Sequence, residues 1–294
     1  MSRITLRHVG SGAVTEVELL PEAGGAIGRY STLTDRQTYH WLLPGDAQTP
    51  SAFPMVPFCS RVRDAKFRFG QRTIRLVANF PPEPHAIHGH GWQSAWAVVE
   101  SRVDMAVLQY QHLADNWPWD YLARQEVELR DSGHLVVSLS VRNQSASTMP
   151  AGLGLHPYFP RTPMARLQAA VGEVWETDEQ LMPIRRVPLP NYMDLPSGVT
   201  VGEPPLDNVF GAWDRQFSIR WPELQAGLRV RASQEFAHLV VYTPAARGYF
   251  CAEPATNVTD GFNMLWRGDA GHGVALLEPG AVLRGSMEFA PSRG

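Results

Sequence analysis

Two side chains that can carry protons each stand directly before a proline. His156 lies in the segment GLGLHPYF (152–159), and Glu253 lies in FCAEPATNVTDGFN (250–263). Proline disfavours helix at the preceding residue and fixes an extended exit, which holds the imidazole in a defined position. The carboxyl group follows an apolar run, where desolvation would raise its pKa and make it a better base. These positions indicate proton transfer; the structural alternatives are a core histidine bonded to a carbonyl and a glutamate that faces solvent.

Three histidines, His85, His88 and His90, lie within six residues in HAIHGHGW (85–92). A zinc site would need further ligands, and neither an H-E-x-x-H motif nor a pair of cysteines accompanies this run. We therefore expect no metal ion here. Hydrogen bonding to a ligand requires only one or two of these rings, and Trp92 can offer an aromatic face beside them.

Arg61, in PFCSRVRDAKFRFG (57–70), supplies a forked donor that suits neighbouring hydroxyl groups. The alternative is a surface ion pair with Asp64, a common arrangement of little energetic weight. All these segments combine apolar runs with Gly or Pro, which is typical of loops that carry functional side chains on a rigid sheet.

Short runs of alternating apolar and polar residues, the period of half-buried strands, dominate the chain. Two hairpins are predicted, over 66–76 with its turn at 70–71 and over 124–143 with its turn at 131–133. Further strands are expected near 14–19, 96–100, 105–112, 216–220, 227–231, 237–242 and 283–289. This pattern predicts an all-β fold, a large antiparallel β-sandwich in a single domain over residues 1–294. The proline-rich stretch 182–206 is interpreted as an excursion within that domain.

Composition and charge exclude several partners. The net charge is −3, and the 25 Arg and the single Lys66 are scattered, without the basic stripe that nucleic-acid binding requires. Cys59 and Cys251 form no C-x-x-C pair, so we expect reduced thiols. A strand-like pattern starts at the N-terminus, and no apolar stretch is long enough for a signal peptide or a membrane span. We therefore expect a cytoplasmic protein without a membrane partner.

Read in order, the segments above resemble the aldose 1-epimerase (galactose mutarotase) family. LDNVF (206–210) and WPWDYLARQEVEL (117–129) extend the resemblance, which covers about residues 55–265. Ser60 replaces the asparagine that usually precedes the family's arginine, and Arg61 is intact. The family's fold is a large antiparallel β-sandwich, the galactose mutarotase-like supersandwich, in agreement with the strand pattern.

The resemblance implies a role for each of five residues. Glu253 would be the general base and His156 the general acid, while Arg61, His88 and Asp207 would bind the sugar hydroxyls and ring oxygen. His90 also precedes a glycine, so the family's His-Gly segment can be aligned on either His88 or His90, with His85 a weaker third choice. The implied activity interconverts the α and β anomers of a free aldose, with a monosaccharide as partner and no cofactor.

Three other functions remain open. A hexose-6-phosphate 1-epimerase would need a basic pocket, which Arg63, Arg68 and Arg72 could supply. A catalytically silent sugar-binding module could keep Arg61 and Asp207 for recognition. Lyase or hydrolase activity on a polysaccharide is a more distant alternative, because related sandwiches host several chemistries. The sequence identifies neither the preferred aldose nor the oligomeric state.

Overall fold

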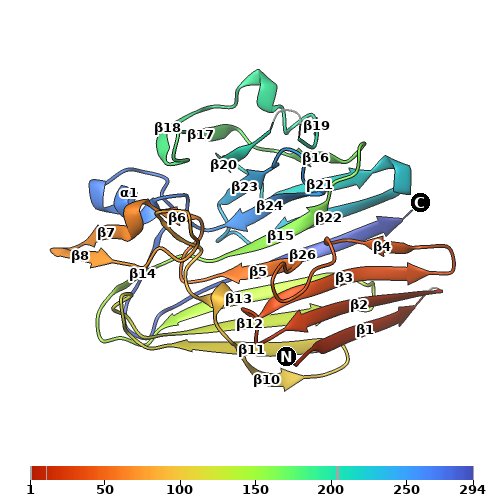
Figure 1. Cartoon of the computed structure of the whole chain (residues 1–294), viewed down its shortest axis with the longest axis horizontal. Coiled ribbons are helices and arrows are strands. Elements are labelled where there is room, and N and C mark those ends of the chain that lie inside the picture. Colours follow the sequence, from red (N-terminus) through yellow and green to blue (C-terminus); the bar gives the residue numbers. More distant parts are fainter. Residues whose placement is uncertain (1, 11, 203–204, 294) are drawn as a thin grey trace.

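The chain folds as two antiparallel β-sheets stacked face to face (Figure 1). This computed structural model describes residues 2–10, 12–202 and 205–293. The all-β sandwich predicted from the sequence is confirmed, as are both predicted hairpins. Among the described residues, no helix is long and apolar enough to cross a membrane.

The larger sheet has eleven strands within the described part of the chain. In spatial order they are β1 (Ile4–Gly10), β2 (Ala13–Leu20), β3 (Ala26–Thr34), β5 (Ala52–Met55), β15 (Gly154–Pro160), β24 (Tyr249–Ala255), β23 (His238–Tyr242), β20 (Asp207–Gly211), β17 (Glu173–Thr177) and β18 (Pro183–Pro188), with β4 (Thr38–His40) beside β3.

The second sheet has nine strands, again counting described residues only. Their order is β10 (Ala97–Ser101), β11 (Met105–His112), β12 (Tyr121–Leu129), β13 (Leu135–Asn143), β26 (Val282–Arg293), β22 (Ala226–Ala232), β21 (Gln216–Trp221), β16 (Arg166–Ala169) and β19 (Val199–Thr200).

Short pairs and helical turns complete the structure. The pairs are β6 (Arg61–Val62) with β9 (Ala86–Ile87), β7 (Lys66–Phe69) with β8 (Arg72–Arg75), and β14 (Met149–Ala151) with β25 (Ala275–Leu277). The helical elements are α1 (Gly261–Arg267) and the 3-10 turns η1 (Arg63–Ala65), η2 (Gly91–Gln93), η3 (Asn191–Met193) and η4 (Pro222–Leu224).

The core between the sheets follows from the two-residue period. Every second residue of β12, from Tyr121 to Leu129, is buried, and the residues between them are partly exposed. The main apolar cluster runs from Leu6 to Phe289 and includes the fully buried Trp117. Each large apolar side chain buried there contributes roughly 1.5–3 kcal/mol to folding. Since the N- and C-terminal strands share this core, we propose that the chain forms a single domain.

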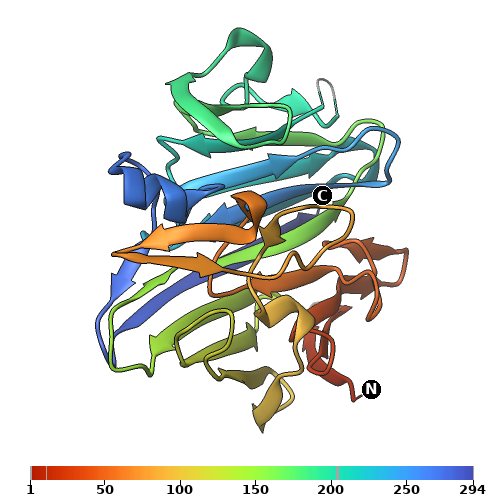
Figure 2. The ribbon, with the colours of Figure 1, turned by 60° about the vertical axis from the view of Figure 1, so that its left-hand side comes forward.

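The other face of the larger sheet carries a second apolar cluster, to which Phe53, Val209 and Val240 belong. Residues 56–96, here called the roof segment, contain β6 to β9 and cross in front of the central strands, in orange to gold in Figure 2. The carbonyl of Val56, directly after β5, holds the later part of this segment against its beginning, because it accepts the N–H groups of His90 at 2.9 Å and Gly91 at 3.1 Å. Gly89 is required at this point: its φ is +71°, and a Cβ would lie 2.1 Å from that carbonyl oxygen.

Candidate active site

A cavity of about 200 Å³ lies on this second face, under the roof segment. Its walls include all five residues to which the resemblance assigns a role, which are Arg61, His88, His156, Asp207 and Glu253. They come from β6, from the turn after β9, and from the central strands β15, β20 and β24. Side chains separated by nearly 200 residues therefore meet around one space.

His156 and Glu253 stand opposite each other on neighbouring strands. The register that pairs Gly154 with Ala255, and Tyr158 with Cys251, places His156 across from Glu253. Nε2 of the imidazole lies 3.3 Å from Oε1 of the carboxyl group, and the two residues are only 8% and 3% exposed. Both stand inside strands rather than on loops, which differs from the sequence-based expectation.

Burial governs the protonation of this pair. It raises the pKa of Glu253 well above its usual value, with a further contribution from the Asp207 charge. It lowers the pKa of His156 to about 3. Because burial disfavours an isolated charge on either group, the pair holds one proton in total over the neutral range, between Oε1 and Nε2. The pair can therefore give one proton while it takes another.

His88 is held as a neutral hydrogen-bond donor. Its Nδ1 accepts the backbone N–H of Ser60 at 3.1 Å, which leaves the ring proton on Nε2. Burial, with the nearby His156 and Arg61, lowers the pKa of His88 well below its usual value. Its ring meets the ring of His156 edge-on, with centroids 5.1 Å apart. Both His88 and Ser60 adopt a φ of 59°, so the local backbone is strained where the ring enters the cavity.

Arg61 is bound by a glutamate that sequence reasoning missed. Its Nε and Nη2 donate to Oε1 of Glu83 at 3.3 and 3.1 Å, while Oδ2 of Asp207 lies 3.9 Å from Nη2. The alternative pair of Arg61 with Asp64 is not formed, since Asp64 contacts Lys66 at 3.4 Å. Burial raises the pKa of Asp207, and the guanidinium opposes that rise. The proline-rich run 81–84 around Glu83 was the signal for a structured loop at this place.

Aromatic rings form much of the cavity wall. Phe53, the strand partner of His156, stacks on its imidazole with centroids 4.6 Å apart and on Trp92 at 5.1 Å. Tyr158 stacks on the imidazole at 4.7 Å. The sequence indicated Trp92 but missed the wall residues Phe53, Phe80, Tyr242 and Tyr249.

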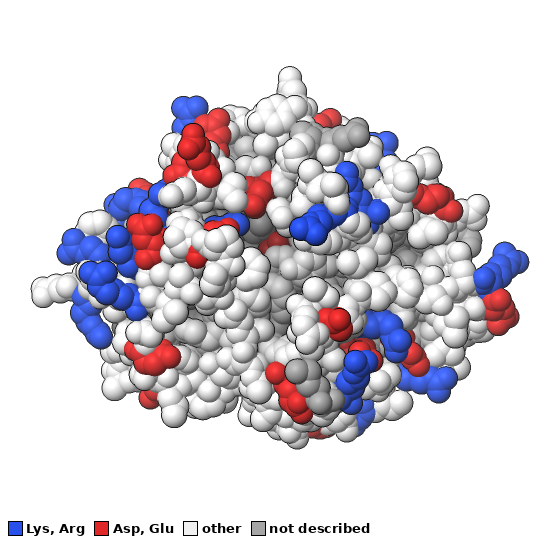
Figure 3. Space-filling view, viewed as in Figure 1, with Lys and Arg blue, Asp and Glu red and all other residues white. Residues whose placement is uncertain are grey.

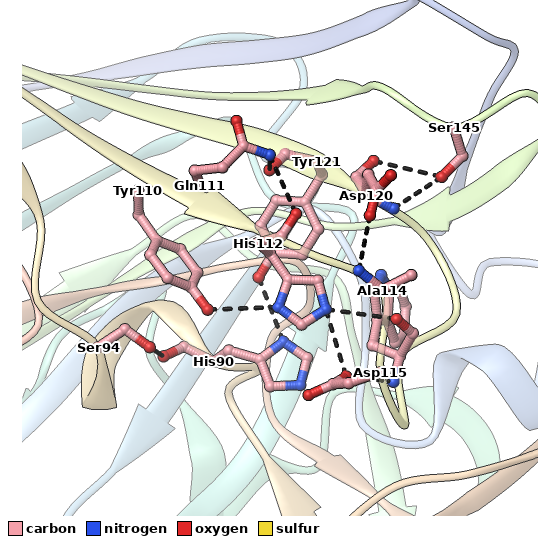
Figure 4. Close-up of polar contacts among 11 residues, drawn as sticks. His90, Ser94, Tyr110, Gln111, His112, Ala114, Asp115, Asp120, Tyr121 and Ser145 are labelled. Carbon is pink, nitrogen blue, oxygen red and sulfur yellow. Dashed lines mark hydrogen bonds and ion pairs between the residues drawn. The ribbon is translucent and has the colours of Figure 1, made fainter.

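The three histidines of the roof segment do not converge on one point. His88 lines the cavity, whereas Nδ1 of His85 accepts the backbone N–H of Asp64. Nδ1 of His90 lies 3.2 Å from the Tyr121 hydroxyl, and its ring stacks on His112 (Figure 4). Of His88 and His90, only His88 faces the cavity, so the assignment of sugar binding to His88 stays a prediction that this geometry favours.

The arginines that could have bound a phosphate lie elsewhere. Arg63 donates to Asp178 and Gln180, and Arg68 lies over the Trp266 ring, 4.4 Å from its centroid. These two arginines line a separate groove between the β7–β8 hairpin and α1, where cationic side chains gather at the left edge of Figure 3. Arg72 lies on β8 and lines neither site. Among the described residues, Arg61 is the one Lys or Arg in the cavity wall.

Comparisons with known proteins identify the family of this chain. The sequence profile of the family described as aldose 1-epimerase matches residues 8–290. The protein YphB of Escherichia coli K12, which is uncharacterised, is 30% identical over 266 residues, or 86% of this chain and 89% of YphB.

Solved structures share the fold along the whole chain. A candidate aldose 1-epimerase from Escherichia coli K12 superimposes with a TM-score of 0.86 at 26% identity, over 100% of both chains. An aldose epimerase homologue from C. elegans has a TM-score of 0.85 over 99% of both chains and, at 14% identity, shows the fold alone. On its sequence, its fold and the extent of the profile match, this chain belongs to the aldose 1-epimerase family.

Proposed function

We propose that this protein is an aldose 1-epimerase that interconverts the α and β anomers of a free monosaccharide by ring opening. The observation that carries the proposal is the contact between His156 Nε2 and Glu253 Oε1, 3.3 Å apart in the wall of one cavity. Opening a cyclic aldose removes a proton from the hydroxyl on C1 and delivers one to the ring oxygen. Both oxygens are bonded to C1, so the acceptor and the donor must stand side by side.

The pair meets this requirement with the one proton that it holds. The step starts from the form of the pair in which the shared proton lies on Nε2 of His156: Glu253 takes the proton of the C1 hydroxyl while His156 gives the shared proton to the ring oxygen, and the bond from C1 to that oxygen breaks. After rotation about C1–C2, reclosure runs the two transfers in reverse. The pair returns to its starting state, and no electrons are exchanged. General acid and base groups each typically contribute on the order of 10²–10⁴-fold to rate.

Arg61, His88 and Asp207 would hold the sugar in register. A guanidinium and a neutral imidazole donate hydrogen bonds, and a carboxylate accepts them, which suits vicinal hydroxyls. The stacked rings of Phe53 and Trp92 offer an apolar surface to the C–H face of the sugar. Such positioning lowers the entropic part of the barrier.

Charge in the cavity favours a free sugar over a phosphorylated one. The single guanidinium, that of Arg61, is already bonded to Glu83, and the wall also carries the carboxyl groups of Asp207 and Glu253. A phosphate would bring about −1.5 to −2 further charge into this space without a free cationic partner. The hexose-6-phosphate alternative therefore has no observation in its favour.

The direct test is an anomer-exchange assay by polarimetry or NMR on glucose, galactose, xylose, arabinose and glucose 6-phosphate. We expect catalysed exchange of at least one free sugar and none of the phosphosugar. Preference for glucose 6-phosphate would overturn the substrate class. If the protein bound sugar but exchanged its anomers no faster than the Glu253→Gln variant, it would be a silent binding module, and the proposed activity would be overturned.

A further inference from the structure

Cys251 stands directly beside the proton-carrying pair. It precedes Glu253 by two residues on β24, so both side chains point to the same face of the sheet. Three possible metal-ligand atoms lie within 4.8 Å of one another here, one each from His156, Cys251 and Glu253, and all three residues are buried. In the described part of the chain, no other group of three or more His, Cys, Asp or Glu residues brings its ligand atoms this close together.

The three atoms are a nitrogen, a sulfur and an oxygen, the donor set that zinc accepts. Zinc sites that keep an open position commonly have three protein ligands, with water or another small ligand in the fourth place. Sulfur distinguishes such a site from one for magnesium or calcium, which prefer oxygen ligands. Because His156 and Glu253 line the cavity and Cys251 lies behind them, the open position would face the sugar.

We propose that His156, Cys251 and Glu253 form a binding site for one zinc ion at the floor of the cavity, and that the bound ion blocks the epimerase. The blocking effect rests on the proposed function, whereas the binding does not. On binding, the thiol proton and the proton held by the pair leave for solvent, so that a thiolate, a neutral imidazole and a carboxylate coordinate the ion. The two proton carriers are then both occupied, and the metal takes the place of the sugar's C1 oxygens.

Cys251 allows the metal site to be separated from the proposed chemistry. Its side chain is fully buried, does not line the cavity and has no part in the proton transfers. Cys59 is the matched control, because it is the other free cysteine and is equally buried but belongs to no such group among the described residues. Cys251→Ser and Cys251→Ala both remove the sulfur, so the test remains possible if one of the two variants does not fold.

The experiment uses cadmium as an optical probe and zinc as the inhibitor. Cadmium titration should produce a thiolate-to-metal ultraviolet band that saturates at one ion per chain in the wild type and in Cys59→Ser, and is absent from the Cys251 variants. Saturating sugar should suppress the band. Zinc should inhibit anomer exchange by the wild type, and a chelator should restore it. The Cys251 variants should keep their basal rate and need at least about tenfold more zinc for half-inhibition, the lower end of losses seen for even an outer-shell partner.

Two outcomes would overturn the site. One is an unchanged cadmium band in the Cys251 variants, and the other is zinc inhibition of equal strength in those variants and the wild type. If the protein exchanged no sugar at all, the cadmium titration would still decide whether the site exists. Failure of the proposed function can thus be told apart from failure of the metal site.

Discussion

His88 and His90 stand two residues apart on the same roof segment, and their side chains enter different surroundings. The ring of His88 joins His156 and Glu253 at the cavity. The ring of His90 lies nearly parallel to that of His112, with centroids 4.6 Å apart (Figure 4). Both regions bury histidines, and in both burial lowers a histidine pKa, to about 4 for His90 and about 3 for His156.

The two regions differ in whether the protein itself supplies hydrogen-bond partners for the histidine ring nitrogens. In the His90 cluster both ring nitrogens of His112 have protein partners: Nδ1 contacts the Tyr110 hydroxyl, and Nε2 donates to the Trp117 carbonyl and also lies 3.4 Å from Asp115. In the cavity, Nε2 of His156 lies 3.3 Å from Oε1 of Glu253, and its Nδ1 is buried without a hydrogen-bond partner among the described residues. A shifted pKa therefore does not separate a site from a core. Incomplete pairing beside a cavity does, because a ligand can complete it.

The largest effect should come from Glu253→Gln. The amide keeps the shape and hydrogen-bonding ability of the side chain but cannot take a proton from the C1 hydroxyl. We expect sugar binding to survive and exchange to fall by at least about 10²-fold, the lower end for loss of a general base. Polarimetry and calorimetric titration measure the two quantities. An exchange rate near that of the wild type would show that Glu253 is not the general base. The cavity would then not differ in function from the His90 cluster.

His156→Ala should reduce turnover by a similar factor, and the pH profile of the unaltered enzyme should show the one-proton state of the pair. A second proton enters as the pH falls toward about 3, the lowered pKa of His156. On the alkaline side the shared proton leaves once the pH passes the raised pKa of Glu253. The dependence of kcat/KM on pH should therefore be bell-shaped. If kcat/KM fell on neither the acid nor the alkaline side, or if activity survived in His156→Ala, the assignment of the proton transfers to this pair would be wrong.

Glu83→Gln should act on sugar binding rather than on the chemistry. The carboxylate positions Arg61 by accepting two hydrogen bonds from its guanidinium group, and both side chains are partly exposed, so the ion pair is screened. We expect about a fivefold rise in KM with kcat nearly unchanged, equivalent to about 1 kcal/mol. Glu100→Gln, at the exposed pair with Arg102, is the control and should leave both constants unchanged. A fall in kcat alone would assign Glu83 to the chemistry instead.

The smallest effect on catalysis should come from His90→Gln, whose consequence is for acid stability. Burial lowers the pKa of His90 from 6.5 to about 4, so the unfolded chain binds this proton more readily than the native one. The native state therefore loses stability as the pH falls from about 6.5 to about 4, by up to about 3 kcal/mol from this group. Urea unfolding at both ends of that window should show a shallower loss in the variant, with kcat/KM unchanged at neutral pH. An equal slope in both proteins would show that His90 does not carry this sensitivity.

The sequence predicted local structure well, and the order of its motifs along the chain indicated the family. Both hairpins could be predicted because a turn and its flanking alternation lie within some twenty residues. The segments around His156 and Glu253 pointed to the family. Their placement inside strands was not predicted, because the prolines that follow them suggested strand ends. Pro157 and Pro254 instead stand within β15 and β24, paired with Ala52 and Leu239.

What the sequence could not give depends on contacts between distant residues. His88 and His90 each precede a glycine, and nothing local distinguishes them; the bonds to Ser60 and Tyr121 do. Glu83 and Phe53 acquire their places only when the roof segment and β5 meet the central strands. The arginines considered for phosphate binding face another groove for the same reason.

His156 and Glu253, the proposed acid and base, stand on hydrogen-bonded neighbours in the middle of the larger sheet, while the roof segment supplies part of the cavity wall. Because β15 and β24 are hydrogen-bonded to each other within the sheet, we expect gentle warming or dilute denaturant to weaken sugar binding through the roof segment before it alters the spacing of His156 and Glu253. We likewise expect substitutions in the roof segment to affect sugar binding more than the proton transfers of His156 and Glu253. Under the proposed function, the sugar contacts are divided between the roof segment, with Arg61 and His88, and the larger sheet, with Asp207, whereas both proton carriers belong to the sheet alone.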